Sequence, residues 1–173
     1  FSEDGTLLWS AVIGGNSEET GDDVAVAADG SVYITGTFIS TCHFYHQGGL
    51  VSAGSLTSNG NRDIYLAKYS AAGQFLWAQR TGNSNDDLYP VLACDASNVH
   101  LMGSFKGNLV VAGSPSAPSL NPSVYNLFIA RYTHTGALVS MICGGSAGND
   151  VSSNLTSDGT RLIAAYAAGE ANV

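Results

Sequence analysis

Short runs rich in apolar, β-branched and aromatic residues recur along the chain, and polar stretches with Gly, Asn and Asp separate these runs. The run DIYLAKY (63–69) shows the pattern most clearly. On an extended strand, Ile64 and Leu66 lie on one face and Tyr65 and Ala67 on the other. Neither face is polar, which predicts a strand in a sheet that is covered on both sides.

Three further runs accompany this one and predict neighbouring strands. VAVAAD and SVYITG flank the pair Asp29-Gly30, which favours a tight hairpin turn. DIYLAKY is followed by a turn at Ala72-Gly73 and then by QFLWAQ. These β-branched and aromatic runs predict four antiparallel strands in one unit.

The unit is repeated along the chain. When Gly5, Gly73 and Gly136 are superposed, the flanking residues align as well. Asp29, Asp95 and Asp158 align, and Phe38 aligns with Phe105, while Ser140 and Ala165 interrupt the pattern in the last copy. The residues that define the repeat, and that we expect to have structural roles, are Gly5, Trp9, Gly36, Tyr69, Gly73, Trp77, Gly103, Tyr132 and Gly136.

Small four-stranded sheets buried on both faces stack around an axis as the blades of a β-propeller. We therefore predict an all-β fold of roughly 2.5 blades, each a four-stranded antiparallel sheet. The predicted units are the last strand of a preceding blade (1–15), two complete blades (16–82 and 83–145) and the first two strands of a further blade (146–173). A closed propeller has about four to eight blades, so we expect an incomplete propeller or a segment of a larger one.

The repeat resembles the SBBP-type β-propeller repeat. The matching residues, in order, are Asp63, Ala67, Lys68, Tyr69, Gly73, Trp77, Gly82, Asp87, Asp95, Val99 and Gly103. The last copy departs from the pattern at Asn126, Ser140 and Ala165. The resemblance implies an extracellular or cell-surface scaffold without assigned catalysis. Trp9 and Trp77 occupy a fixed place in the repeat, which favours packing between blades over a binding platform for a sugar or cofactor. They also give a weaker similarity to the tryptophan-docking repeats of quinoproteins.

Composition narrows the choice of partners. Charged residues make up 12% of the chain, and the net charge is −8 with only six Lys and Arg. This charge disfavours binding to nucleic acid or to anionic membranes. No apolar run approaches the roughly 18 residues that span a bilayer, so we expect no membrane insertion. A surface rich in Ser, Thr, Asn and Gly favours an extracellular or cell-surface location.

Three cysteines stand far apart in the sequence: Cys42, Cys94 and Cys143. They form no CxxC pair, so a thiolate zinc site is disfavoured. Buried free thiols are the favoured interpretation, because free cysteine packs as a small apolar residue. One disulfide with a remaining free thiol is the alternative.

Candidate chemistry is sparse. Asn83, Asn85 and Asp87 alternate as oxygen ligands of calcium do, although Asn and Asp also favour turns by bonding their own backbone. We favour the turn and keep calcium as the alternative. Ser146 lies in a G-x-S-x-G pattern, but a nucleophile elbow needs a strand and a helix around it. Asn154 is a weak glycosylation candidate in an N-x-T sequon.

Two segments vary between the copies, residues 39–62 and 106–125, and GSPSAPSLNPS in the second predicts a loop. Variable loops on a repeated frame commonly carry recognition, so we expect protein contacts there.

No catalytic or cofactor set emerges, and we expect no enzymatic activity. The predicted function is an extracellular repeat protein used as a scaffold, for adhesion, or for self-assembly through exposed blade faces or further blades of the same chain. The alternatives are a segment of a propeller enzyme of the lyase or quinoprotein type, or a glycan- or ligand-binding propeller.

Overall fold

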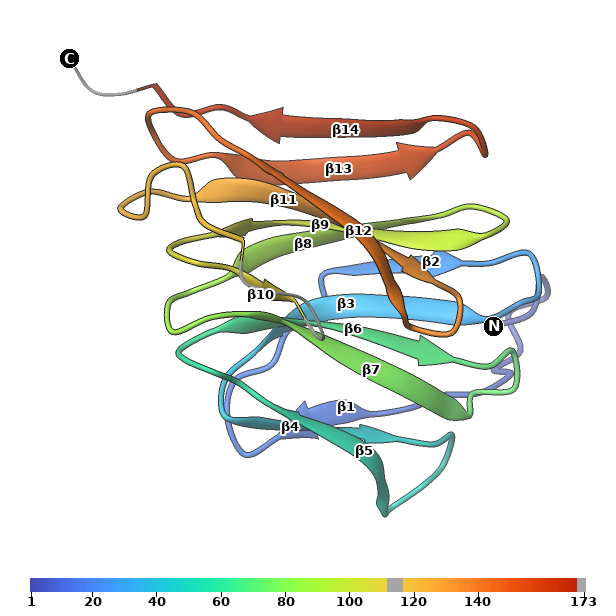
Figure 1. Ribbon diagram of the computed structural model, residues 1–173. Helices are drawn as coiled ribbons and strands as arrows, with labels where there is room; N and C mark the ends of the chain where they lie inside the picture. Colours follow the sequence, from blue (N-terminus) through green and yellow to red (C-terminus); the bar gives the residue numbers. More distant parts are fainter. Residues whose placement is uncertain (112–116, 171–173) are drawn as a thin grey trace.

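The computed structural model describes residues 1–111 and 117–170, and these residues form an all-β structure without a helix (Figure 1). In particular, they include no helix long and apolar enough to cross a membrane. The strands of the described residues are β1 (Ile13–Gly15), β2 (Asp23–Val26), β3 (Val32–Phe38), β4 (Thr41–Tyr45), β5 (Ser52–Thr57), β6 (Asp63–Tyr69), β7 (Phe75–Gly82), β8 (Leu88–Cys94), β9 (Asn98–Phe105), β10 (Val110–Val111), β11 (Asn126–Thr133), β12 (Leu138–Gly144), β13 (Val151–Ser157) and β14 (Leu162–Ala167).

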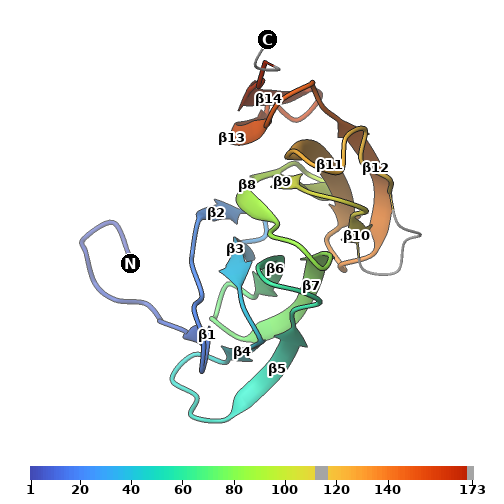
Figure 2. The same ribbon diagram turned by 90° about the vertical axis from the view of Figure 1, so that its left-hand side faces the viewer.

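The strands pair antiparallel and form four sheets, which lie as successive layers from β1 to β14 (Figures 1 and 2). The first sheet has the order β1-β4-β5 and the second β10-β7-β6-β3-β2. The third sheet has the order β12-β11-β9-β8, and the fourth consists of β13 and β14. The predicted all-β antiparallel architecture is therefore confirmed.

The second and third sheets repeat one topology. In each of them, four strands lie side by side in the order in which they occur in the chain: β2-β3-β6-β7 in the second sheet and β8-β9-β11-β12 in the third. The second sheet has β10 as an additional strand beside β7. β3 pairs with β6 as β9 pairs with β11. The sequence repeat thus corresponds to a repeat of strand order.

Strand β6 is buried on both faces, as the lack of a polar face in its sequence predicts. All seven of its residues are buried. Ile64 and Leu66 enter the core between the second and third sheets, while Tyr65 and Tyr69 enter the core between the first and second sheets. One central strand therefore links two separate cores, because its side chains alternate between the faces.

The three cores lie between successive sheets. The core between the second and third sheets is the largest, and its buried residues are Tyr33, Ile64, Leu66, Leu92, Val99, Leu101, Phe105, Leu109, Val111, Phe128, Ala130 and Tyr132. The core between the first and second sheets is largely aromatic and contains Phe38, Cys42, Phe44, Tyr65, Ala67 and Tyr69. Between the third and fourth sheets the core is small and consists of Ala93, Met102 and Leu155.

The predicted turns are present. The Oδ1 atoms of Asp29, Asp95 and Asp158 each accept a hydrogen bond from the main-chain N–H two residues later. This local bond closes the hairpin turn, as Asp commonly does. Gly73 and Gly136 have φ angles of 74° and 88°, a left-handed conformation that favours glycine.

The strand expected within residues 1–15 is largely absent. A regular strand begins only at Ile13, where residues 13–15 pair with Cys42–Phe44 of β4. The upstream residues nevertheless alternate, because Trp9 and Ala11 pack on the first core while Leu8 and Val12 are exposed.

The segment 39–62, expected as a variable loop, forms the hairpin β4–β5. Cys42 and Phe44 of β4 cover the aromatic face of the second sheet, and the Phe44 ring lies 5.7 Å from the Tyr65 ring between centroids. The segment is thus structural, because it buries a face that would otherwise expose tyrosine rings.

The second variable segment also contributes a strand. Val110 and Val111 form β10, which pairs with Gly82 and Thr81 at the edge of the second sheet. Residues 112–116 of this segment, which include the start of the predicted GSPSAPSLNPS loop, lie outside the described residues.

The alignment of Ala165 with the repeat glycines is wrong by one position. The turns at Asp95 and Asp158 close in the same way, by a bond from the Asp main-chain N–H to the carbonyl three residues later. Counted from these turns, the counterpart of Gly103 is Tyr166. At Gly103 a larger side chain would meet the ring of Phe128 on the neighbouring strand β11. Tyr166 has no such neighbour, because β14 pairs only with β13 within the described residues.

Candidate functional site

The loop Asn83–Asp87, which joins the second and third sheets, brings together the three calcium candidates. The main-chain N–H of Asn83 donates to Asp87 Oδ2 at 2.8 Å, and its side-chain amide donates to Asp87 Oδ1 at 3.3 Å. Asn83 Oδ1 accepts the main-chain N–H of Asn85 at 2.8 Å. These contacts use the polar atoms within the loop, in agreement with the favoured turn.

The same loop recurs between the third and fourth sheets. There the main-chain N–H of Ser146 donates to Asp150 Oδ2 at 2.6 Å, and Ser146 Oγ donates to Asp150 Oδ1 at 2.7 Å. Ser146 is the serine of the G-x-S-x-G pattern, and its hydroxyl also contacts the carbonyl of Gly169. It lies between strands and closes a loop, which is the role of Asn83 one repeat earlier.

Burial dominates the electrostatics of the first of these loops. Removal from water, with a smaller contribution from the nearby carboxylates of Asp63 and Asp86, raises the pKa of Asp87 to about 8. Burial also raises the pKa of Asp63, against hydrogen bonds from Asn59 and Arg80. The Arg80 guanidinium lies 2.9 Å from Asp63 Oδ2.

Calcium binding at this loop stays an untested alternative to the favoured turn. The described residues contain no group of three or more His, Cys, Asp or Glu side chains placed to hold a metal ion. Asn83, Asn85 and Asp87 form a loop rather than a set of ligands directed at one point, because the amide nitrogens of both asparagines are bonded to oxygens of the same loop and of Lys106.

Each repeat tryptophan lies under the turn of the following repeat. The Trp9 indole N–H donates to the carbonyl of Ala71 at 3.0 Å, and the Trp77 indole N–H donates to the carbonyl of His134 at 3.3 Å. Ala71 and His134 occupy the same position relative to the turn glycines. The two tryptophans therefore bind successive turns in the same way.

Repeat tyrosines Tyr69 and Tyr132 also have related surroundings. Each is fully buried at the end of an inner strand, and each packs in a core that includes the tryptophan of the preceding repeat. The Trp9 and Tyr69 rings stack with centroids 6.2 Å apart. Burial raises the pKa of both phenols to about 12.

Gly36 and Gly103 lie so close to neighbouring atoms that a side chain would not fit at either position. A Cβ on Gly36 would lie 1.9 Å from the carbonyl oxygen of Thr20, and one on Gly103 would lie 2.7 Å from the Phe128 ring. Gly5, by contrast, has open space around it and is retained for its φ angle of 85°.

A network around His134 was not found by sequence reasoning. Tyr33 Oη lies 2.6 Å from His134 Nδ1, and His134 Nε2 lies 3.2 Å from the carbonyl of Asp95. Lys68 Nζ donates to the carbonyl of His134 at 3.1 Å and lies over the Tyr33 ring. This network ties the second sheet to the turn between β11 and β12. His134 belongs to a polar turn, so its long-range partners leave no pattern in the sequence.

The cysteines are free, and their burial differs. Cys42 is fully buried, as expected, and burial raises the pKa of its thiol to about 12. Cys94 is half-buried with a pKa raised to about 11. The expectation of a buried thiol is wrong for Cys143, which is exposed on outer strand β12. No pair forms the alternative disulfide.

The sequon asparagine, Asn154, is exposed in β13. Its neighbour Leu155 points the other way, into the small core against the third sheet.

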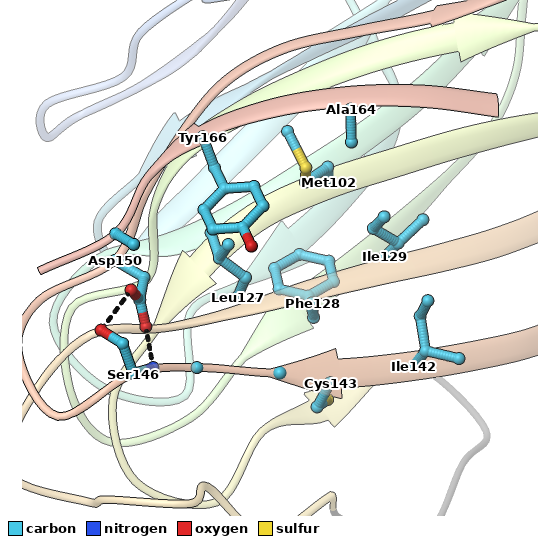
Figure 3. A pocket seen from close by; sticks show the side chains of 13 residues that line it. Met102, Leu127, Phe128, Ile129, Ile142, Cys143, Ser146, Asp150, Ala164 and Tyr166 are labelled. Atoms are coloured by element: carbon cyan, nitrogen blue, oxygen red, sulfur yellow. Dashed lines mark hydrogen bonds between the residues drawn. The ribbon is translucent and has the colours of Figure 1, made fainter.

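An apolar groove lies between β11–β12 of the third sheet and β14 of the fourth (Figure 3). Its volume is about 240 Å³. Tyr166 and Ala164 of β14 face Ile129 and Ile142 across it, and the bonded pair Ser146–Asp150 closes one end (Figure 3). The remaining lining residues are Met102, Leu127, Phe128, Cys143, Gly144, Gly145 and Ala168.

Comparison with known proteins gives one distant relative. The regulatory protein FlaEY of Caulobacter vibrioides is 25% identical to this chain over 170 residues, in an alignment that covers 94% of this chain. The same alignment covers 17% of FlaEY, so the chain spans only a small part of that protein's length. No protein-family model matches the chain.

Proposed function

We propose that the second and third sheets are complete blades of a β-propeller and that the fourth sheet is part of another. The observation that supports this most strongly is the repeated contact of Trp9 with the turn at Gly73 and of Trp77 with the turn at Gly136. Equivalent contacts between successive repeats are expected in a propeller, whose blades pack on one another in a regular way. The likeness to SBBP-type repeats supports the same interpretation.

The role that we propose is a non-catalytic scaffold, used for structure, adhesion or self-assembly. The most polar clusters of the chain serve its architecture: Asp87 and Asp150 each close a loop, and His134 joins two sheets. The polar side chains of these clusters are therefore occupied by turn formation and by contacts between sheets.

Exposed apolar side chains on the outer strands support assembly with further protein. Val24 and Val26 of β2 are 60% and 66% exposed, and Ile163 and Tyr166 of β14 are 54% and 55% exposed. Apolar side chains grouped on strands favour protein contacts. We propose that further blades, of this polypeptide or of other copies, cover them. The alignment with a short part of a longer regulatory protein fits a repeat module within a larger polypeptide.

We propose an extracellular or cell-surface location, which the likeness to SBBP-type repeats and the low charged fraction of 12% support. Limited proteolysis of intact cells, read with an antibody against this chain, tests the location. Loss of the signal without cell lysis is expected. A signal that persists until the cells are lysed would contradict it. Sedimentation of the purified chain over a range of concentrations tests self-assembly, and a strictly monomeric chain would contradict that part of the proposal.

A further inference from the structure

Ile129 and Ile142 of the third sheet form the floor of the apolar groove. This floor is more exposed than the equivalent surface of the second sheet. Leu66 of β6 is fully buried, whereas its counterpart Ile129 of β11 is only half-buried. Ile142 of β12 is 66% exposed, although its counterpart Gln79 of β7 is half-buried. An isoleucine is thus more exposed than the glutamine in the equivalent place.

The reason is visible in the preceding repeat, where the hairpin β11–β12 covers this surface. Its turn accepts hydrogen bonds from the second sheet: Trp77 and Lys68 donate to the carbonyl of His134, and Gln79 donates to the carbonyl of Gly136. The corresponding surface of the third sheet receives only β13 and β14 among the described strands.

The edge of β14 next to the groove has no neighbouring strand within the described residues, unlike the equivalent strands β3 and β9. β3 pairs with β2 and β6, and β9 pairs with β8 and β11, whereas β14 pairs only with β13 within the described residues. A strand edge presents a row of unpaired N–H and C=O groups. The open edge and the apolar floor adjoin each other, since Ala164 and Tyr166 of β14 line the groove (Figure 3).

We propose that this groove is an acceptor site for one more β-hairpin of the β6–β7 or β11–β12 type. The first strand of the hairpin pairs with β14, as β6 pairs with β3. In β6, one face carries Tyr65, Ala67 and Tyr69 and packs in the core between the first and second sheets. The corresponding face of the added strand then covers Ile129 and Ile142 of the third sheet. Strand addition of this kind takes its affinity from main-chain hydrogen bonds and its specificity from alternate side chains.

The inference rests on the blade repeat proposed above, but not on an extracellular location or a scaffolding role. Its test therefore uses the purified chain alone. A copy of residues 63–82 is attached after Val173 through a flexible Gly/Ser linker as long as the connection between β9 and β11. A short flexible tether gives an effective concentration on the order of millimolar, which removes the requirement for tight binding in trans.

Two changes are expected in the extended chain. Hydrogen exchange of the main-chain amides in β14 slows by about tenfold or more, and the melting temperature rises by about 4 °C. A matched extension carrying Tyr65→Asp and Ala67→Asp in the copy keeps the linker and the turn but loses the apolar face, and it should give neither change.

Substitutions in the groove make the test specific. Ile142→Asp places a charge in the floor and should abolish the slowing of exchange. Val139→Asp is the control, since Val139 is an exposed residue of the same strand that does not line the groove. It should leave the slowing intact.

Unchanged exchange in β14 would overturn the inference, and so would equal slowing by the intact and the Asp-bearing copies. Dimerisation of the unextended chain that Ile142→Asp abolishes would assign the groove to a second copy and would also overturn it. Cell-surface proteolysis reports on the proposed location independently of these results.

Discussion

The indole of Trp77 lies directly against Gly136, only 3.1 Å from the position that a Cβ on this glycine would take. Trp9 has the same relationship to Gly73, with a distance of 2.8 Å. In both pairs the glycine also has a positive φ angle. Each turn therefore requires glycine for two reasons: its backbone conformation is left-handed, and the indole ring leaves no room for a side chain.

Gly136→Ala should therefore destabilise the protein more than a glycine substitution at a turn without a ring. We expect a loss of about 2–4 kcal/mol, from the left-handed backbone together with overpacking against Trp77. Gly159→Ala is the control, because Gly159 has a φ angle of 89° but nothing within 4 Å of its Cβ position. It should cost about 1 kcal/mol. Urea unfolding measures both values.

A double-mutant cycle checks the cause of the larger loss. If the ring is responsible, Gly136→Ala should cost much less in a Trp77→Leu background, because leucine leaves room for the methyl group. Equal costs in the two backgrounds would show that the contact between the sheets does not restrict this turn.

The raised pKa of Asp87 predicts a pH dependence of stability. An unperturbed Asp has a pKa of about 3.9, whereas Asp87 in the folded protein titrates at about 8. Between these values the folded protein holds a proton that the unfolded chain has released, so the contribution of Asp87 to stability falls as the pH rises from about 4 to about 8. Asp87→Asn should remove this slope in urea unfolding measured across that range.

Asp158 gives the opposite slope and serves as a comparison. Hydrogen bonds from Arg161 and Thr160 lower its pKa, so its contribution is lost as the pH falls. A stability difference between wild type and Asp87→Asn that stays constant from pH 4 to pH 8 would contradict the protonated state assigned to Asp87.

The loop Asn83–Asp87 predicts indifference to calcium. Its amide nitrogens and carboxylate oxygens already bond one another, so an ion would have to replace existing contacts. We expect the melting temperature to be the same with excess calcium and with a chelator. A drop on chelation that Asn85→Ala abolishes would instead establish the calcium site.

The three thiols should differ in reactivity. Cys143 is exposed and should react with iodoacetamide in the folded protein, while Cys42 is fully buried with a pKa raised to about 12. Thiolate is the reactive form, so Cys42 should react only after unfolding. Mass spectrometry of digested, labelled protein gives the order, and early labelling of Cys42 would contradict the burial of the first core.

Local patterns in the sequence predicted the repeated part of the fold well. The alternation in residues 63–69 is a property of the strand itself, and so is the Asp that closes each hairpin turn. Glycines at Gly73 and Gly136 mark the turns because few other residues adopt their φ angles.

Features that depend on distant partners were not predictable in this way. β4 and β5 pair because their side chains cover Tyr65 and Phe75, and nothing within residues 39–62 indicates that cover. The strand β10 has two residues and is defined by the edge of β7. His134 acquires its role only when the sheets come together, so it carried no signal in the sequence.

Proton–proton contacts between sheets test the account most directly. In a nuclear Overhauser spectrum of the folded chain, the Hα protons of Gly73 should contact the Trp9 indole and those of Gly136 should contact the Trp77 indole. Both glycines should also show chemical shifts displaced by the ring currents. If one pair shows the contact and the other does not, or if neither does, successive sheets are not placed by the same interaction and the repeated-blade account is wrong.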